Sequence, residues 1–284
     1  MLVNMKEVLE KAQQGGYAVG AFNIVNYLTA AAVIDEAQAL QAPVILQTSQ
    51  KTVIQIGAKR LACFVCPLAE AASIPVVLHL DHGSDPELAK ECVDQGFTSV
   101  MIDMSRKPLE ENIRICREIA EYAHGKNVSV EGEIGAIVGV EDHVCVKESE
   151  AALADVQSAS RFVRETGIDF LAPAIGTAHG LYKGEPKIEF DLFADLRKNI
   201  PVPMVIHGGT GLADDVFRRL IEMGAAKINI STALKIAYCG TIAQYFADGG
   251  KKDPLAVDLE AYKAVREMTR QHIELFGAVG KAAL

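Results

Sequence analysis

The sequence lacks two features that would point to nucleic acids or membranes, namely an excess of basic residues and a long hydrophobic run. It has 28 Lys and Arg against 37 Asp and Glu, which gives a formal net charge of −9. An acidic chain gains little from the phosphate backbone, so we expect no nucleic-acid partner. No stretch approaches the roughly 18 uncharged apolar residues of a spanning helix, and the first residues lack the apolar core of a signal peptide. We therefore expect a cytoplasmic protein with no membrane partner.

The chain also lacks a cysteine framework, a linker and a low-complexity tract. Its six cysteines, at positions 63, 66, 92, 116, 145 and 239, are scattered through helix-like contexts. This pattern is typical of reduced thiols rather than disulfides. We expect Cys63 and Cys66 to pack in the core. Because α/β barrels routinely use 200–250 residues for one core, residues 1–284 are predicted to form one domain.

What recurs in the sequence is a short β-branched apolar run followed by a longer helical pattern. The runs are apolar almost throughout, which is typical of parallel strands buried on both faces. There are eight of them, at residues 17–22, 43–47, 75–80, 98–102, 128–131, 169–174, 203–206 and 227–230.

Amphipathic patterns between these runs predict helices, for example at residues 28–40, 110–123, 158–166 and 214–223. A β-then-α unit repeated eight times, at about 35 residues each, is the arithmetic of a (β/α)8 barrel. A doubly wound open sheet is the alternative. No glycine-rich fingerprint follows the first run, which favours the barrel. We therefore predict an α/β protein, a single (β/α)8 TIM barrel with an extra N-terminal helix at residues 4–14, capped by Asn4 and Glu7, and with C-terminal helices.

Polar residues gather where the predicted strands end, and four of the seven histidines are among them. In such a barrel these strand ends meet at one rim, where function collects. A single histidine there is often only hydrogen-bonded. Three imidazoles that converge from separate strand ends are typical of a catalytic zinc site, in which the fourth position is open for substrate. His82, His179 and His207 fit this pattern, whereas His79 lies deeper and is interpreted as structural.

Two further features adjoin these histidines. Asp81 could shuttle a proton to a substrate oxygen or could orient a ligand, and the sequence leaves both interpretations open. The glycine-rich loop HGGTG at residues 207–211 precedes a predicted helix, and the segment Asn229, Ile230, Ser231 and Thr232 follows the next strand. Loops at this place in a barrel commonly bind phosphate, although tight-turn geometry would also explain the glycines.

At this point the chain resembles a known family, the class II, zinc-dependent ketose-bisphosphate aldolases of the fructose- and tagatose-bisphosphate type. The resemblance covers nearly the whole length. It rests on VVLHLDHG at Val76–Gly83, GTAHG at 176–180, HGGTG at 207–211 and KINIST at 227–232, with further matches at Val19–Asn23, 99–103, 130–135 and 182–186.

The resemblance implies a role for individual residues. His82, His179 and His207 match zinc ligands, and Glu133 matches a carboxylate that can enter the metal shell. Asp81 matches the acid/base residue, and Glu141 matches a catalytic glutamate on a mobile loop. The positions that match substrate-binding residues are Asn23, Gln47, Ser49, Gly180, Lys183, Gly208, Gly209, Thr210, Asn229, Ile230, Ser231 and Thr232.

The implied activity is reversible cleavage of a ketose 1-phosphate or 1,6-bisphosphate to dihydroxyacetone phosphate and an aldehyde, through a metal-stabilised enediolate. The substrate is therefore a small phosphorylated sugar. The resemblance also implies a monovalent cation, Na⁺ or K⁺, beside the phosphate, and a homodimer or homotetramer.

Two positions depart from the family. Val138 stands where the mobile loop usually has the first glycine of a pair, which puts the mobility of that loop in doubt. Leu255 stands where Asp-Pro-Arg usually supplies an arginine to the distal phosphate of a neighbouring subunit's substrate. Arg106 and Lys107 are candidate replacements. The alternatives are therefore a non-phosphate distal group, as in sulfofructose 1-phosphate, which would give sulfolactaldehyde, or a non-catalytic aldolase-like subunit.

Overall fold

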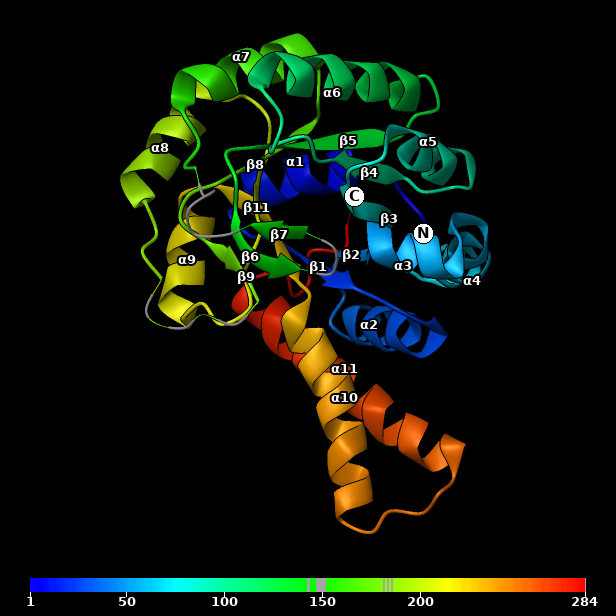
Figure 1. The fold of residues 1–284 in the computed structure, drawn as a ribbon. Helices are drawn as coiled ribbons and strands as arrows, with labels where there is room; N and C mark the ends of the chain where they lie inside the picture. Colours follow the sequence, from blue (N-terminus) through cyan, green and yellow to red (C-terminus); the bar gives the residue numbers. More distant parts are fainter. Residues whose placement is uncertain (142–143, 147–151, 181, 183, 185, 284) are drawn as a thin grey trace.

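In the computed structural model, eight parallel strands close into a barrel in the order β1-β11-β10-β8-β5-β4-β3-β2 (Figure 1). The structure describes residues 1–141, 144–146, 152–180, 182, 184 and 186–283. The barrel strands are β1 (Val19–Asn23), β2 (Val44–Ser49), β3 (Val76–Gly83), β4 (Ser99–Ile102), β5 (Ser129–Ile134), β8 (Phe170–Pro173), β10 (Met204–Ile206) and β11 (Ala225–Ile230). Each of the eight predicted runs overlaps one of them, so the predicted (β/α)8 fold is confirmed.

Helices surround this barrel and follow its strands along the chain (Figure 1). They are α1 (Met5–Gly15), α2 (Tyr27–Ala39), α3 (Gln50–Ile56), α4 (Ala58–Ala71), α5 (Pro86–Asp94), α6 (Leu109–His124), α7 (Val156–Thr166), α8 (Phe190–Asn199), α9 (Asp214–Glu222), α10 (Thr232–Ala247) and α11 (Pro254–Leu275). No single helix of the described residues is long and apolar enough to span a membrane; only α3 and α4 together pass by length and composition, across a 101° bend.

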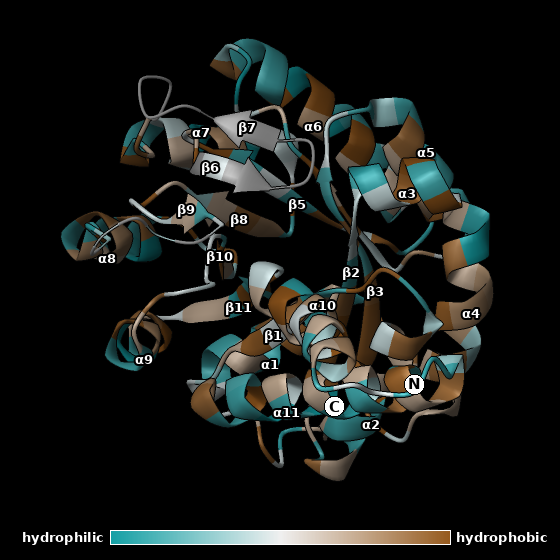
Figure 2. Cartoon of the chain, turned by 60° about the horizontal axis from the view of Figure 1, so that its bottom comes forward, coloured by the Kyte–Doolittle hydropathy of each residue, from teal (hydrophilic) through white to brown (hydrophobic). Residues whose placement is uncertain are grey.

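The strands form because their apolar residues are buried on both faces, as the uninterrupted runs predict. Every residue of β1, β2, β3 and β11 is buried. The outer helices show hydrophilic and hydrophobic stretches side by side, because one face packs on the barrel and the other meets water (Figure 2). The barrel also buries charged and polar side chains, among them Asp81, Glu131 and Lys227.

The N-terminal helix begins close to the predicted place. Asn4 caps α1 by accepting a hydrogen bond from the Lys6 amide at 2.8 Å, so the cap bond does not involve the predicted partner Glu7. Gly16 ends the helix in the left-handed conformation, at φ 65°, which costs glycine little.

A small second sheet was not predicted from the sequence. It has the strand order β7-β6-β9 and is formed by β6 (Val138–Glu141), β7 (Val144–Val146) and β9 (Ala178–His179). β6 pairs in parallel with β9, with Val138 opposite Ala178 and Gly139 opposite His179. A Cβ on Gly139 would lie 2.3 Å from the His179 carbonyl oxygen, so only glycine allows this approach. The sheet thus holds the segment that carries His179.

The last two helices form a hairpin that extends away from the barrel (Figure 1). Its base is held to α2 by the buried carboxylate of Glu36, whose oxygens each lie 2.7 Å from a guanidinium nitrogen, one of Arg266 and one of Arg270. Along the hairpin, large apolar side chains are exposed, among them Ile236, Phe246, Leu255 and Leu259.

The prediction that Cys63 and Cys66 pack in the core is wrong for Cys63 and only partly right for Cys66. Cys63 is exposed and Cys66 is partly buried, although both lie on α4 as the helical pattern indicates. The buried residues Leu61 and Val65 lie on the side of α4 opposite Cys63, and Cys66 lies at the edge of that buried face. An apolar helix pattern therefore did not reveal which face the barrel covers.

Candidate active site

The end of β3 brings two adjacent side chains, those of Asp81 and His82, to the mouth of the barrel. Successive residues of a regular strand point to opposite faces, so neighbours would not normally share a site. His82 adopts a positive φ of 49°, and the register between β3 and β4 shifts between Leu80 and Gly83. This irregularity redirects the chain, and it lets both polar side chains serve the same mouth.

The structure brings together the three histidines that the sequence singles out. One ring nitrogen from each of His82, His179 and His207 lies within 4.8 Å of the others, and all three residues are buried. The nitrogens His207 Nδ1 and His82 Nε2 are 2.9 Å apart. In a tetrahedral zinc site with Zn–N distances of about 2.0–2.1 Å, ligand nitrogens lie about 3.4 Å apart. A small adjustment therefore fits this cluster to a zinc ion.

Glu133 lies beside this cluster as the resemblance implies. Its Oε2 atom is 3.9 Å from Nδ1 of both His82 and His207. This oxygen is buried and has no hydrogen-bond partner among the described residues. A buried carboxylate oxygen without a partner is costly, and a cation would remove the cost. The residues present thus fit a divalent metal with nitrogen and oxygen ligands.

The charges of the cluster point the same way. Burial, and then the charge of His82, lowers the pKa of His179 and of His207 well below the ordinary value. Burial also opposes protonation of His82, but the carboxylates around it outweigh burial and raise the pKa of His82 well above its ordinary value. Burial, followed by the charge of Asp103, raises the pKa of Glu133. A metal ion here would therefore meet neutral imidazoles at two positions and replace a proton at His82.

Side chains that sequence reasoning did not single out as site residues fix the orientation of the histidines. Asp103 Oδ2 lies 2.9 Å from His82 Nδ1, which leaves Nε2 for a ligand. Glu131 Oε1 lies 2.7 Å from His207 Nε2, which leaves Nδ1. Partners of this kind set the tautomer and the ring orientation of metal-binding histidines. Glu131 could have been found from its position two residues before Glu133, since both point to one face of β5.

Beneath the histidines a buried ion pair crosses the barrel. Lys227 Nζ on β11 donates to Glu131 Oε2 on β5 at 2.8 Å, and both side chains are 0% exposed. His79 Nε2 lies 3.5 Å from the same oxygen, while His79 Nδ1 lies 2.9 Å from the Ser99 hydroxyl. His79 is therefore part of the packed interior, in agreement with its structural interpretation.

Asp81 is held by amide donors rather than by a cation. Asn23 donates to Asp81 Oδ2 at 2.8 Å and Asn229 donates to Oδ1 at 3.1 Å. Gln47 in turn donates to the Asn23 side-chain oxygen at 2.7 Å. These bonds fix the carboxylate at the mouth through neutral groups. Two of the predicted substrate-binding residues thus contact Asp81, and a third, Gln47, holds one of them.

The glycine-rich loops meet at one small hollow. It is lined by Gly180, Gly208, Gly209, Thr210, Asn229, Ser231 and Thr232, all of them predicted substrate-binding residues. The N-terminus of the 16-residue helix α10 lies here, with Ser231 at its N-cap position. The Ser231 hydroxyl is buried, and no described residue is its hydrogen-bond partner. Amides, hydroxyls and a helix dipole make such a hollow suitable for an anion.

The remaining predicted residues lie in varied places. Ser49 caps α3 through the Thr52 amide, and Ile230 is buried at the end of β11. Glu141 ends β6, Val138 begins it, and Lys183 falls outside the described residues. Arg106 and Lys107 are exposed on the loop after β4, and Lys107 lies 3.4 Å from Glu111.

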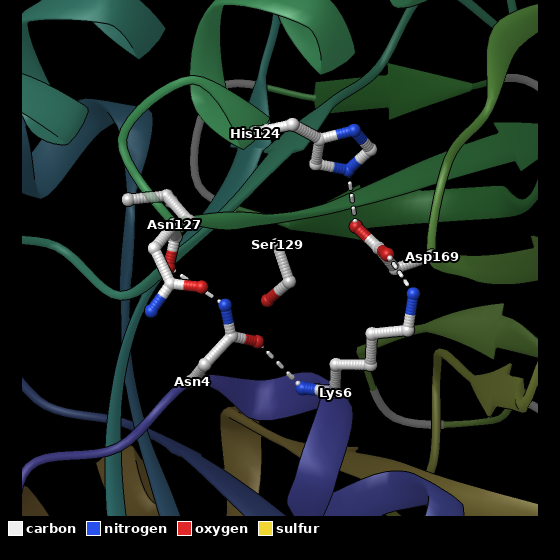
Figure 3. A pocket seen from close by; sticks show the side chains of 7 residues that line it. Asn4, Lys6, His124, Asn127, Ser129 and Asp169 are labelled. Atoms are coloured by element: carbon white, nitrogen blue, oxygen red, sulfur yellow. Dashed lines mark hydrogen bonds and ion pairs between the residues drawn. The ribbon is translucent and has the colours of Figure 1, made fainter.

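Another cavity, of about 200 Å³, lies where β5 and β8 begin, away from the strand ends that carry the histidines. Figure 3 shows the residues that line it. There Asp169, almost fully buried, lies 2.8 Å from His124 Nε2 and 3.1 Å from Lys6 Nζ, and it accepts a hydrogen bond from the Val130 amide at 2.9 Å. The side chains of His124 and Lys6 line the cavity and point toward this carboxylate (Figure 3). These contacts tie α1 and α6 to the sheet, so we interpret the cluster as stabilising.

Comparison with known proteins agrees with the fold and with the family that the sequence resembles. The sequence model of the family described as "Fructose-bisphosphate aldolase class-II" matches residues 3–281. The chain is 42% identical over 286 residues to a fructose-bisphosphate aldolase of Geobacillus stearothermophilus, covering 99% of both chains. It is 39% identical over 284 residues to a 6-phospho-5-dehydro-2-deoxy-D-gluconate aldolase of Bacillus licheniformis, covering 99% of this chain and 96% of that one.

Solved structures show the same similarity. The YdjI aldolase from Escherichia coli K12 superimposes with a TM-score of 0.89 at 32% identity, over 100% of both chains. A putative fructose-1,6-bisphosphate aldolase from Coccidioides immitis gives a TM-score of 0.89 at 28% identity, over 97% of this chain and 96% of that one. The protein is thus an aldolase, a lyase that acts on carbon–carbon bonds, and it belongs to the class II fructose-bisphosphate aldolase family.

Proposed function

We propose that this protein is a zinc-dependent aldolase that reversibly cleaves a ketose 1-phosphate, with or without a second phosphate, to dihydroxyacetone phosphate and an aldehyde. The observation that carries the proposal is the convergence of His82, His179 and His207 beside the immobilised carboxylate of Asp81. A binding subunit without activity would need neither the three imidazoles nor this carboxylate, which argues against the non-catalytic alternative.

The histidines would hold Zn²⁺, and Glu133 would be available as an additional oxygen ligand. When bound there, the ion would act as a Lewis acid that stabilises the negative charge developing on the three-carbon half of the substrate. Asp103 and Glu131 keep His82 and His207 in the required orientation.

Asp81 would accept the proton of the C4 hydroxyl during cleavage and return it during condensation. Its amide partners, Asn23 and Asn229, hold the carboxylate in place through neutral groups. Glu141 would act on the carbon of the dihydroxyacetone phosphate half, as the resemblance implies.

The hollow lined by Gly208, Gly209, Ser231 and Thr232 would bind the 1-phosphate. The Ser231 hydroxyl, which has no partner among the described residues, and the α10 N-terminus support this assignment. Lys183 and a monovalent cation, Na⁺ or K⁺, would add positive charge. Holding the phosphate fixes the three-carbon unit in register with Asp81, which lowers the entropic part of the barrier.

The far end of the substrate would be treated differently from that of an ordinary bisphosphate. Leu255 lies at the tip of the α10–α11 hairpin, is 66% exposed, and cannot supply an arginine fork. That fork would be worth about 1.5–3 kcal/mol to a charged group. The relative from Bacillus licheniformis is named for a phosphorylated sugar acid, so a carboxylate, like a sulfonate, is a candidate distal group. Arg106, which is exposed on the loop after β4, would bind such an anion.

We further propose a homodimer or homotetramer in which the hairpin contacts another copy. The exposed apolar side chains Ile236, Phe246 and Leu259 support this, since so much apolar surface on one protruding element is unusual for a monomer. Sedimentation of the wild type and of Phe246→Asp tests it: the wild type should sediment as an oligomer and the variant as a smaller species.

The substrate proposal is tested by comparing kcat/KM across a panel. The panel contains fructose and tagatose 1,6-bisphosphates and ketose 1-phosphates with sulfonate, carboxylate, hydroxyl or methyl at the far end. We expect dihydroxyacetone phosphate as the common product, and a preference for a distal anion that falls in Arg106→Ala. A bisphosphate preferred by more than about 100-fold, unaffected by Arg106→Ala or Lys107→Ala, would show that Leu255 does not alter specificity. The absence of any cleavage would contradict the aldolase substrate class.

A further inference from the structure

The hydroxyl of Tyr182 joins two segments of the active-site rim that are far apart in sequence. It accepts a hydrogen bond from the Ala178 amide at 3.0 Å and donates one to the Gly208 carbonyl oxygen at 2.7 Å. Ala178 lies on β9 next to His179, and Gly208 follows His207 in the glycine-rich loop. Burial raises the pKa of Tyr182, so its hydroxyl keeps the proton that it donates.

The bond to Gly208 fixes more than a carbonyl group. In a planar trans peptide the C=O and the following N–H point in opposite directions, and the described residues contain no cis peptide. The carbonyl of Gly208 shares its peptide unit with the amide of Gly209. Holding that carbonyl on Tyr182 therefore turns the Gly209 N–H away from Tyr182. Gly209 lines the small hollow beside the N-terminus of α10, and its amide has no hydrogen-bond partner among the described residues.

A fixed orientation needs such a bond because glycine peptides rotate easily. Gly208 has φ 68°, and a glycine can adopt this conformation or several others at similar energy. The surroundings require glycine, since a Cβ on Gly208 would lie 2.4 Å from the Ala178 carbonyl oxygen and one on Gly209 would lie 2.9 Å from that of Asn229. The close approach of the loop to β9 and β11 thus requires glycine at both positions, but it does not decide which way the peptide between them faces.

We propose that Tyr182 is a positioning residue that aims the Gly209 amide at the phosphate of the three-carbon unit. This rests on the proposed function, because it assumes that the hollow binds that phosphate. Without the hydroxyl, the peptide can rotate and present its carbonyl oxygen to the anion. His179 keeps independent support, because β9 also pairs with β6. The effect should therefore fall on the phosphate and not on the histidine cluster.

The test is Tyr182→Phe, with Tyr122→Phe as the matched control. Tyr122 also uses its hydroxyl in hydrogen bonds, to Asp94 at 2.8 and 3.0 Å, on the outer helix α6. Binding of dihydroxyacetone phosphate and of dihydroxyacetone is measured by calorimetry on the metal-loaded protein, together with zinc content and Tm. A net hydrogen bond changes an equilibrium by roughly 3- to 10-fold. We expect Tyr182→Phe to weaken dihydroxyacetone phosphate binding by about tenfold, with dihydroxyacetone binding, zinc content and Tm close to the wild type.

The outcomes separate the two proposals. A wild type that binds both ligands equally would refute the phosphate hollow itself. A wild type that prefers the phosphate, together with a Tyr182→Phe variant that keeps the same preference, would overturn the role of Tyr182. Equal loss of both ligands, with a lower Tm or lower zinc content, would show that Tyr182 only stabilises the fold. If the preference falls in Tyr182→Phe and not in Tyr122→Phe, the positioning role is supported.

Discussion

Removing the buried cation of Lys227 should destabilise this protein strongly, and removing its partner as well should restore much of the loss. Lys227 Nζ and Glu131 Oε2 are 2.8 Å apart, and both side chains are 0% exposed. In Lys227→Met the Glu131 carboxylate stays buried without its counter-ion. Breaking a buried pair in this way costs about 3–5 kcal/mol. With roughly 2–4 °C of Tm for each kcal/mol in a protein of this size, Tm should fall by about 6–20 °C.

The double variant Lys227→Met/Glu131→Gln leaves no buried charge at this place. The amide oxygen introduced by Glu131→Gln can still accept a hydrogen bond from His207 Nε2, so the packing is kept. We expect the double variant to recover at least half of the loss, because neutral replacements of buried pairs are often tolerated. Zinc affinity should nevertheless fall by about 10–100-fold, since an amide orients His207 less strongly than a carboxylate.

The assays are thermal and urea unfolding of the apoprotein, and competition for zinc between the protein and a chelator. Lys126→Met is the control, because its ion pair with Asp94 lies on the surface and should change Tm little. Two results would refute the reasoning that Glu131 depends on Lys227. One is a fall of less than about 1 kcal/mol in the free energy of unfolding of Lys227→Met, well under the cost of a broken buried pair. The other is strict additivity of the effects of the two substitutions.

Two further substitutions separate chemistry from stability. The Asp81→Ala variant should still bind zinc and dihydroxyacetone phosphate. Its cleavage rate should fall by about 10²–10⁴-fold, because positioned proton transfer is lost. Cleavage at the wild-type rate would show that Asp81 only orients a ligand. Asp169→Asn, at the opposite end of the barrel, weakens the bonds to the Val130 amide, His124 and Lys6, so the free energy of unfolding in urea should fall by about 1.5–3 kcal/mol. Its kcat/KM should stay at the wild-type value. A drop in kcat/KM would show that this cavity communicates with the active site.

The sequence was sufficient for the barrel because burial on both faces leaves a direct mark, an uninterrupted apolar run. The rim could be located for the same reason, since polar residues that follow such runs must meet at one end. The geometry at His82 could not be predicted: the strand period places Asp81 and His82 on opposite faces, and only the positive φ and the register shift bring both to the mouth.

Other features were missed because they depend on contacts between distant segments. β9 has only two residues, which is too short for a recognisable strand pattern. Its pairing with β6, some forty residues earlier in the chain, could therefore not be predicted. Glu131 and Lys227 lie within apolar runs, where a charged residue looks like an exception until its partner on another strand is known. Cys63 was expected to be buried and is exposed, because an apolar helix pattern does not indicate which face of the helix the barrel covers.

The most direct test of the central claim is the release of dihydroxyacetone phosphate from a ketose 1-phosphate before and after metal removal. The account predicts that a chelator abolishes release, that one Zn²⁺ per chain restores it, and that restoration fails when His82, His179 or His207 is replaced by alanine. Borohydride added with substrate should trap no covalent adduct, since no lysine Schiff base takes part. Full activity of metal-free protein, or a borohydride-trapped lysine adduct, would contradict the account.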